Sequence, residues 1–290
     1  MITSLLLFFI LPALALGLGY TLIARLIWPS ESSAIISEKW VLLWTFTAYA
    51  LLLLALLYGE AISLLIILYF TAFSFIFVYK GQMPGRGYAD LLNIRGWLAG
   101  LAYGAAAYII AIVLTLLLYI AGLTPGQIIP YLGSFAYFTP WLPEPPQLAI
   151  IGTVITFVYA FIFNLILVAV PEESFFRLHL IGNMSYIIGG LSIVLMEVLW
   201  TVAHIRLLLW DGFPAGAIVI AVGGIILADA YLRFDGSVVV SSIAHATYNA
   251  LIMASSYAAG SLDFLGLLMI FAFVAISLLL GWREVIAGHV

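Results

Sequence analysis

Residues 96–121 read GWLAGLAYGAAAYIIAIVLTLLLYIA, an apolar run that contains no charged side chain. A helix that crosses the hydrocarbon core of a membrane needs about 20 predominantly apolar residues. The chain holds further runs of this kind, so the sequence predicts an all-α, polytopic membrane protein with about nine transmembrane helices. The count falls to eight if the run 40–79, interrupted only at Gly59 and Glu60, is a single span. The other expected spans are 3–28, 40–58, 61–79, 148–170 (alternatively continuing past Pro171 to about 182), 187–209, 213–231, 237–257 and 263–282.

Composition argues against several classes of protein. Of the 290 residues, 66% are hydrophobic and only 8% are charged, whereas soluble domains are about 45–50% apolar and about 25% charged. A net charge of -4 without a basic cluster argues against a nucleic-acid partner. Because the chain has no Cys, disulfides, thiol catalysis and Cys-ligated metals are excluded. We expect a multi-pass protein of the cell (plasma) membrane, in contact with the lipid bilayer.

The positively charged residues suggest an orientation. With nine spans, all Lys and Arg residues except Arg206 fall on one side of the membrane, and the positive side is normally cytoplasmic. The N-terminus is therefore expected outside and the C-terminus inside, with 1–28 a retained span rather than a signal peptide. In this scheme 1–121 forms N-terminal spans without motifs, 122–147 a Pro- and aromatic-rich interfacial loop or a gating lid, and 148–282 the motif-bearing transmembrane core.

The polar residues of the expected spans gather between residues 164 and 249, beginning with PEESFFRL at 171–178. Glu173 and Arg177 are four positions apart, so they share a helical face and are expected to pair. Glu172 lies about 100° around the helix, which leaves this second carboxylate free for general-base chemistry. The alternative is a charge cluster at a cytoplasmic helix end, with Arg177 reaching toward water.

Two more polar pairs follow at helical spacing, in WTVAH (200–204) and HATYN (245–249). Trp200 and His204 share a face, as do His245 and Asn249. Two hydrogen-bond donors that converge on one point are typical of an oxyanion hole, although an interhelical hydrogen-bond patch has the same pattern. Glu197 precedes His204 by seven positions and is expected either to orient its imidazole or to pair with another helix.

The known signatures of three classes of membrane protease are missing. The chain contains no HExxH zinc motif, no GxSG serine motif and no GxGD aspartyl motif.

Two polar residues outside the motifs are expected to have structural roles. Asn164, two turns before Glu172, is expected to bond a neighbouring helix, and Asp229 is expected to pair with Arg233 four positions on.

The ordered motifs EExxxR, aromatic-xxxH and HxxxN resemble the CPBP family, which contains CAAX proteases and bacteriocin-processing enzymes, with type II CAAX prenyl endopeptidases as its best-known members. The resemblance covers roughly residues 148–257, and Trp200 stands where Phe is usual. It implies a glutamate-type intramembrane endopeptidase that acts on a membrane-embedded or lipidated peptide without a cofactor. The residues that it implicates in catalysis are Glu172, Glu173, Arg177, His204, His245 and Asn249.

In the implied mechanism, Glu172 and His204 hold a water, and His245 and Asn249 stabilise the oxyanion. Three alternatives stay open: a zinc held by Glu172, His204 and His245, a catalytically silent immunity or scaffold protein, and a transporter with a proton relay. The expected span boundaries also place His204 at a different depth from Glu172 and His245. The three side chains can then meet only if the helices tilt strongly or the turn at 182–186 is sunk into the membrane.

Overall fold

The computed structural model describes residues 86–123, 149–204 and 215–287, and every regular element in these ranges is a helix. Five of the described helices are long and apolar enough to cross a membrane: Ile94–Ile120, Ile151–Asn183, Gly216–Arg233, Val238–Gly260 and Phe264–Ile286. The all-α, membrane-spanning class is thereby confirmed. The expected spans at 3–28, 40–58 and 61–79, and most of the loop 122–147, lie outside the described residues, so the count of nine and the orientation of the termini stay predictions.

One long helical rod carries the first motif. It consists of α7 (Ala149–Asn164), the π-helical η4 (Leu165–Ala169), α8 (Val170–Glu173) and the π-helical η5 (Ser174–Asn183). Proline lacks an N–H and clashes with the carbonyl four residues earlier in an α-helix. The π-helical turn before Pro171, in which Val170 donates to the carbonyl of Leu165, widens the helix at this point. The rod therefore continues to Asn183, as the longer alternative for this span predicted.

The chain then folds back on itself. After α9 (Ser185–Ile188), Gly189 adopts a φ of 57°, and α10 (Leu191–Ala203) returns along η5. The expected span 187–209 thus begins later, at Leu191, and its described part ends at His204. Both Glu172 and His204 lie about three to four turns from the bend between η5 and α10. The antiparallel hairpin brings them to a similar level, which the expected boundaries did not do.

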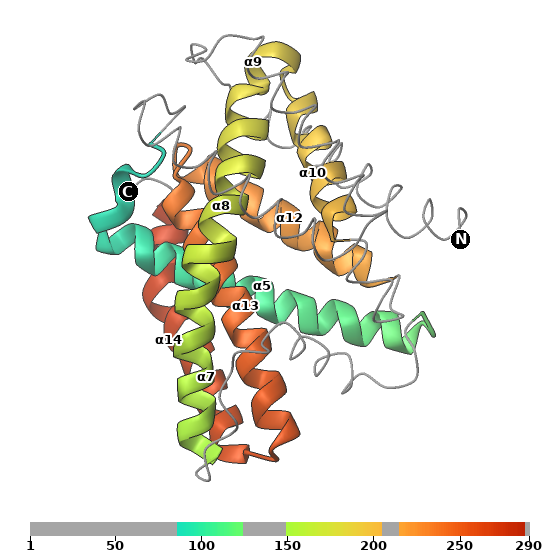
Figure 1. The fold of residues 1–290 in the computed structure, drawn as a ribbon, viewed down its shortest axis with the longest axis vertical. Coiled ribbons are helices and arrows are strands. Elements are labelled where there is room, and N and C mark those ends of the chain that lie inside the picture. Colours follow the sequence, from blue (N-terminus) through green and yellow to red (C-terminus); the bar gives the residue numbers. More distant parts are fainter. Residues whose placement is uncertain (1–85, 124–148, 205–214, 288–290) are drawn as a thin grey trace.

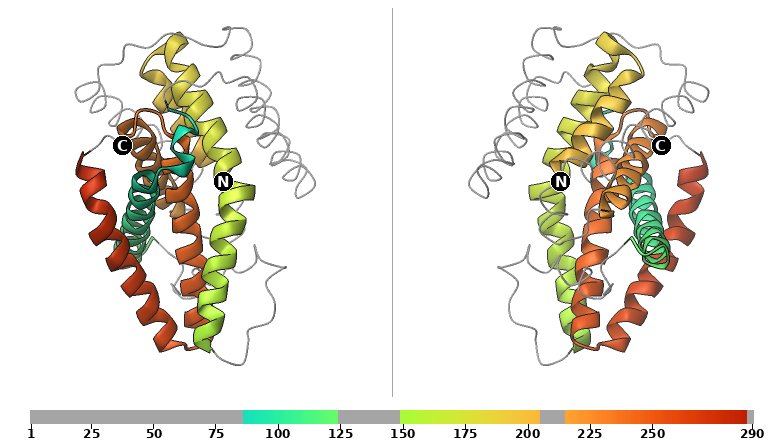
Figure 2. Two further views of the ribbon diagram at one scale, coloured as in Figure 1. Left: turned by 90° about the vertical axis from the view of Figure 1, so that its left-hand side faces the viewer. Right: turned by 90° about the vertical axis from the view of Figure 1, so that its right-hand side faces the viewer.

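The centre of the described fold is α13 (Val238–Gly260), which is buried along almost its whole length. The long rod packs on one side of α13, whereas α5 (Ile94–Ile120) and α14 (Phe264–Ala287) lie on the other (Figures 1 and 2). α12 (Gly216–Arg233) contacts α5, α10 and α13. Because α13 carries the HATYN motif, these neighbours fix the position of the third pair of polar residues.

A close crossing of α5 and α13 depends on small residues. Gly96, Gly100 and Gly104 recur at four-residue spacing along α5. A Cβ at Gly104 would lie 2.5 Å from the carbonyl oxygen of Ala244, and one at Gly100 would lie 2.7 Å from the Cβ of Ile243. Small residues let the backbones of two membrane helices approach closely, and here they bring α5 directly against the segment that carries His245.

The start of α13 is held by the chain on either side. Gly236 donates its N–H to the carbonyl of Tyr231 at 2.9 Å, closing the end of α12, and Ser237 caps α13 by accepting from the N–H of Val240. Arg86 donates its backbone N–H to the carbonyl of Asp235 at 2.8 Å, just before η2 (Ala89–Leu92). These bonds fix where the helix begins, and hence which residues face the rod.

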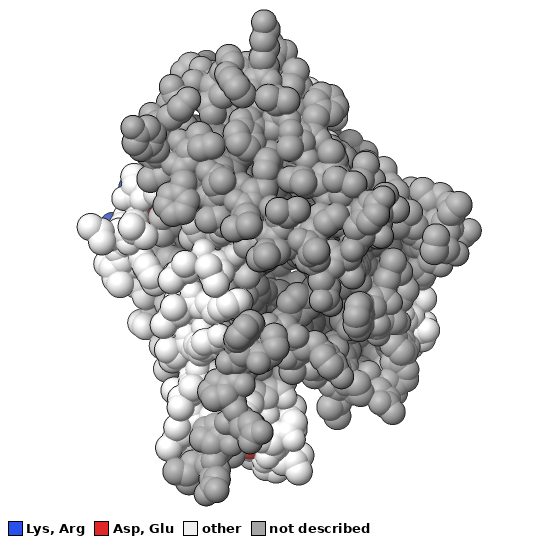
Figure 3. Space-filling model, viewed as in Figure 1, with Lys and Arg blue, Asp and Glu red and all other residues white. Residues whose placement is uncertain are grey.

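The outer surface of the described helices suits lipid. In Figure 3 the described part of the surface is almost free of charged atoms. Large apolar side chains point outward where a soluble protein would place polar ones, and an apolar exterior of this kind is satisfied by hydrocarbon. Examples are Leu116, Ile166, Leu268, Phe271 and Leu279, each of them exposed.

Candidate active site

The ion pair expected in the first motif is present and completely buried. Arg177 donates from Nη1 to Oε1 of Glu173 at 3.0 Å, and neither side chain is exposed. Its Nη2 donates to the carbonyl of Gly224 at 3.0 Å, which ties η5 to α12. The guanidinium also lies 4.3 Å from the ring centroid of Trp200, a cation–π contact. Arg177 is therefore a fixed cation inside the helical bundle and does not reach toward water.

Glu173 also joins the first motif to the third. Its Oε1 lies 3.0 Å from Nδ1 of His245, so one carboxylate oxygen is shared by Arg177 and His245. The sequence predicted the contact with Arg177, because both residues stand on one helix. It did not predict the contact with His245, which requires α8 and α13 to pack together.

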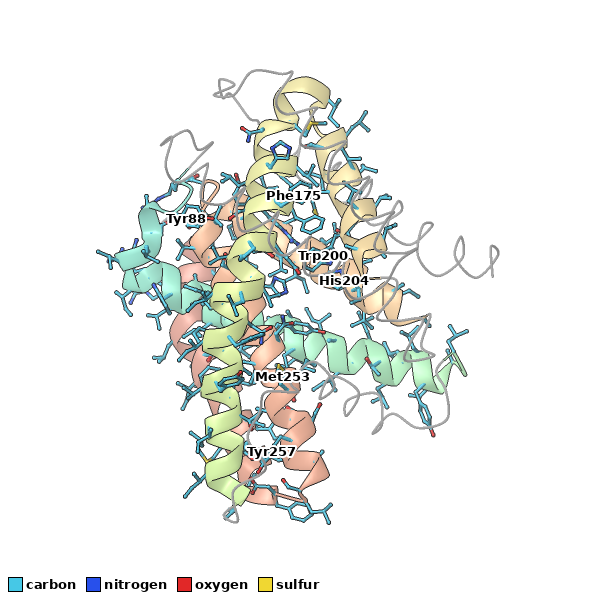
Figure 4. All side chains as sticks on the ribbon, viewed as in Figure 1. Tyr88, Phe175, Trp200, His204, Met253 and Tyr257 are labelled. Carbon is cyan, nitrogen blue, oxygen red and sulfur yellow. The ribbon has the colours of Figure 1, made fainter. Side chains whose placement is uncertain are left out.

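Trp200 brings the second and third motifs together. Its ring centroid lies 4.5 Å from that of His204 and 5.3 Å from that of His245. The indole N–H donates to the carbonyl of Ile220 at 3.1 Å, which fixes the ring against α12. Figure 4 shows Trp200 and His204 in the space between α8 and α10. The aromatic residue of the second motif thus packs against the imidazoles of both His204 and His245.

His204 has a defined tautomer. Its Nδ1 lies 2.7 Å from the carbonyl oxygen of Trp200. Because a carbonyl can only accept, Nδ1 carries the proton, and the ring in its neutral form therefore presents the lone pair of Nε2. His204 lies close enough to Glu172 and His245 to interact with both electrostatically. The lone pair is thus available to accept a hydrogen bond from a water molecule.

Glu172 is the least constrained acid of the first motif. It is half-buried, and its Oε2 is buried without a hydrogen-bond partner among the described residues. Unlike Glu173, it forms no ion pair shorter than 4.0 Å within the described ranges. A carboxylate oxygen that no neighbouring group occupies is free to accept a proton from water.

Asn249 is held from the side by a residue outside the motifs. Its Nδ2 donates to Oδ1 of Asn164 at 3.0 Å, which joins α13 to the end of α7. The expectation that Asn164 bonds a neighbouring helix is confirmed. Its contact with a motif residue was not anticipated, because no spacing rule relates positions 164 and 249.

The carboxylate of Glu197 lies against α12. It is completely buried, and neither of its carboxylate oxygens has a hydrogen-bond partner among the described residues. A Cβ at Gly224 would lie 2.6 Å from its Oε2, and its charge acts on Arg177. Of the two expectations for Glu197, an interaction with another helix is therefore the one that the structure supports.

The predicted Asp229–Arg233 pair is present at 3.3 Å, partly exposed and outside the motifs.

Within the described ranges, no three His, Asp or Glu side chains are grouped so that they could hold a metal ion. The zinc alternative with Glu172, His204 and His245 as ligands therefore has no support in the arrangement of these three residues.

Comparison with known proteins agrees with the motifs. Residues 154–251 match the family described as Rce1-like, type II CAAX prenyl endopeptidase Rce1-like. The matched segment, about a third of the chain, contains all three motifs from Glu172 to Asn249. The family resemblance is thereby confirmed, and it supports a CAAX-type membrane protease at the level of the family. No curated protein and no solved structure matches the chain.

Proposed function

With this family resemblance as the premise, we propose that the protein is an intramembrane endopeptidase. It hydrolyses a peptide bond of a membrane-associated substrate with a water that Glu172 and His204 activate. The observation that carries the proposal is the contact of Trp200 with both His204 and His245, next to the bridge from Glu173 to His245. Through these contacts, three short motifs that are separate in sequence meet at one place.

The two groups that would bind the water, the imidazole of His204 and the carboxylate of Glu172, play different chemical roles. Neutral His204 accepts one O–H of the water at Nε2, and the carboxylate of Glu172 accepts the other. A lone pair of the water oxygen then attacks the carbonyl carbon of the peptide while Glu172 takes the proton. When the C–N bond breaks, Glu172 returns this proton to the leaving amine. The cycle balances without a covalent enzyme intermediate.

His245 and Asn249 supply the proposed oxyanion hole. Asn249 has a second amide N–H besides the one bound by Asn164. Because an ionised Glu173 accepts from Nδ1 of His245, Nε2 of that ring donates to the oxyanion only when both nitrogens are protonated. The charges of Glu172 and Glu173 would then be balanced by Arg177 and an imidazolium at His245. Donors in a site with little water stabilise a developing oxyanion strongly.

The arrangement of acids favours hydrolysis over transport. A proton relay needs acidic groups spread between the two faces of the membrane. Here Glu172, Glu173 and Glu197 all interact electrostatically with one cation, Arg177. The family description names a prenyl endopeptidase, so the proposed substrate is a lipidated peptide of the CAAX type, whose apolar chain would partition into the same bilayer.

The experiment uses the purified full-length protein in detergent with a prenylated CAAX-type reporter peptide. We expect cleavage by the wild type, a loss of about 10²-fold or more in Glu172→Gln and in His204→Ala, and no effect of a metal chelator. Glu284→Gln on α14, outside the site, is the matched carboxylate control and should cleave normally. Loss of activity on chelation would identify a metalloprotease. A folded but inactive wild type would instead favour the silent binding protein.

A further inference from the structure

Asn164 occupies a special position at the junction of α7 and η4. Its side chain is 6% exposed. Its Nδ2 donates to the carbonyl of Ala160 at 2.7 Å and lies 3.5 Å from the sulfur of Met253, while its Oδ1 accepts from Asn249 at 3.0 Å. Each polar atom of this buried amide therefore has a partner.

These contacts determine whether the NH2 group or the oxygen of the Asn249 amide faces Asn164. The carbonyl of Ala160 can only accept, and the thioether of Met253 accepts weakly, so the NH2 group of Asn164 must point toward them. Its Oδ1 then points toward Asn249, and only the NH2 group of Asn249 can satisfy it. A reversed Asn249 would set two carbonyl oxygens against each other.

We propose that Asn164 is a positioning residue that orients the oxyanion-hole donor Asn249. This inference rests on the proposed peptidase function and adds to it a residue that belongs to none of the three motifs. By taking one N–H of Asn249, Asn164 directs the other N–H, about 120° away in the plane of the amide, toward the reacting carbonyl group.

The same contact links the proposed base, Glu172, to the proposed oxyanion donor, Asn249. Asn164 and Glu172 stand about two turns apart on one helical rod, whereas Asn249 stands on α13. Through the Asn164–Asn249 hydrogen bond, the rod that carries the base also sets the direction of the oxyanion donor on its neighbour. A displacement of the rod along α13 would therefore affect both groups together.

A double-mutant cycle on kcat tests this role, with the wild type, Asn164→Leu, Asn249→Ala and the double variant. We expect Asn164→Leu to lower kcat by about 10- to 100-fold, in the range found for partners that orient a functional ligand, with KM within about twofold. In the Asn249→Ala background the same substitution should have no further effect. If Asn164→Leu does not fold, Asn164→Ala takes its place in the cycle.

Thr153→Val is the matched control. It removes another buried hydrogen bond of α7 to a different segment, from Thr153 to Asp263 at 2.6 Å, far along the helix from the site. This variant should lower the Tm and leave kcat unchanged. Additive effects on kcat in the cycle, or an unaltered kcat in Asn164→Leu, would overturn the role of Asn164 while the peptidase function stands. An inactive wild type would overturn the peptidase function, and this role with it.

Discussion

Oε1 of Glu173 lies 3.0 Å from Nδ1 of His245 and equally 3.0 Å from Nη1 of Arg177. A single buried oxygen thus stands between a permanent cation and a ring that can become one. The other oxygen of Glu173 has no hydrogen-bond partner among the described residues. This relationship assigns Glu173 a part in holding His245, although it does not make Glu173 a base.

Glu173→Gln should separate the roles of the two adjacent acids. A glutamine at position 173 can still accept a hydrogen bond from Nδ1 of His245. Because it carries no negative charge, it no longer stabilises the doubly protonated ring of His245. Nε2 of that ring then has no proton to donate to the oxyanion. We expect kcat to fall by about 10²-fold, the effect of removing one oxyanion donor, with KM little changed. Steady-state kinetics on the reporter peptide measure both. A wild-type kcat would show that His245 does not depend on the charge of Glu173.

Arg177→Met should destabilise the protein severely, because it removes the permanently charged partner of the buried carboxylate of Glu173. Breaking a buried ion pair from one side costs about 3–5 kcal/mol. Arg233→Met is the matched control, since its pair with Asp229 is partly exposed and Asp229 keeps a hydrogen bond from Tyr103; a loss of about 0–1 kcal/mol is expected. Reversible unfolding in mixed detergent micelles gives both free energies, and equal losses would contradict this account.

Two adjacent glycines of α12, Gly223 and Gly224, allow the effect of one added methyl group to be compared at a free and at an obstructed position. A Cβ at Gly224 would lie 2.6 Å from Oε2 of Glu197 and 2.7 Å from Cδ1 of Trp200, whereas a Cβ at Gly223 meets no atom within 4 Å. Because Trp200 packs against both histidines, Gly224→Ala should lower kcat by about tenfold or more. Gly223→Ala should keep full activity and a Tm at or slightly above that of the wild type. Activity and Tm in detergent separate the two outcomes.

The crossing of α5 and α13 should tolerate no side chain at Gly104. A Cβ there would lie 2.5 Å from both the carbonyl oxygen of Ala244 and the Cβ of Thr247, and overpacking of this kind costs about 1–3 kcal/mol. Gly260→Ala, at the end of α13, places its Cβ in open space and should be neutral. Unfolding measurements that found Gly104→Ala as stable as Gly260→Ala would mean that the helices separate here at little cost.

Local regularity made part of the site predictable. The Glu173–Arg177 and Asp229–Arg233 pairs are both present at the expected spacing of four residues, because a helix fixes such neighbours wherever it packs. The apolar runs likewise identified each of the five described helices that are long enough to span a membrane. Their ends were less certain, since the π-helical turn at Pro171 and the turn at Gly189 depend on how the chain packs beyond them.

The sequence by itself therefore determined the membrane class, the helical type and the contacts within single helices, because these follow from apolar length and from 3.6 residues per turn. The packing of the helices against one another decided that Glu173 and Trp200 both reach His245 and that Asn164 holds Asn249. Each of these contacts joins different helices. Their geometry depends on where the rod, α10 and α13 cross, and the close packing of small and aromatic residues between the helices sets those crossings.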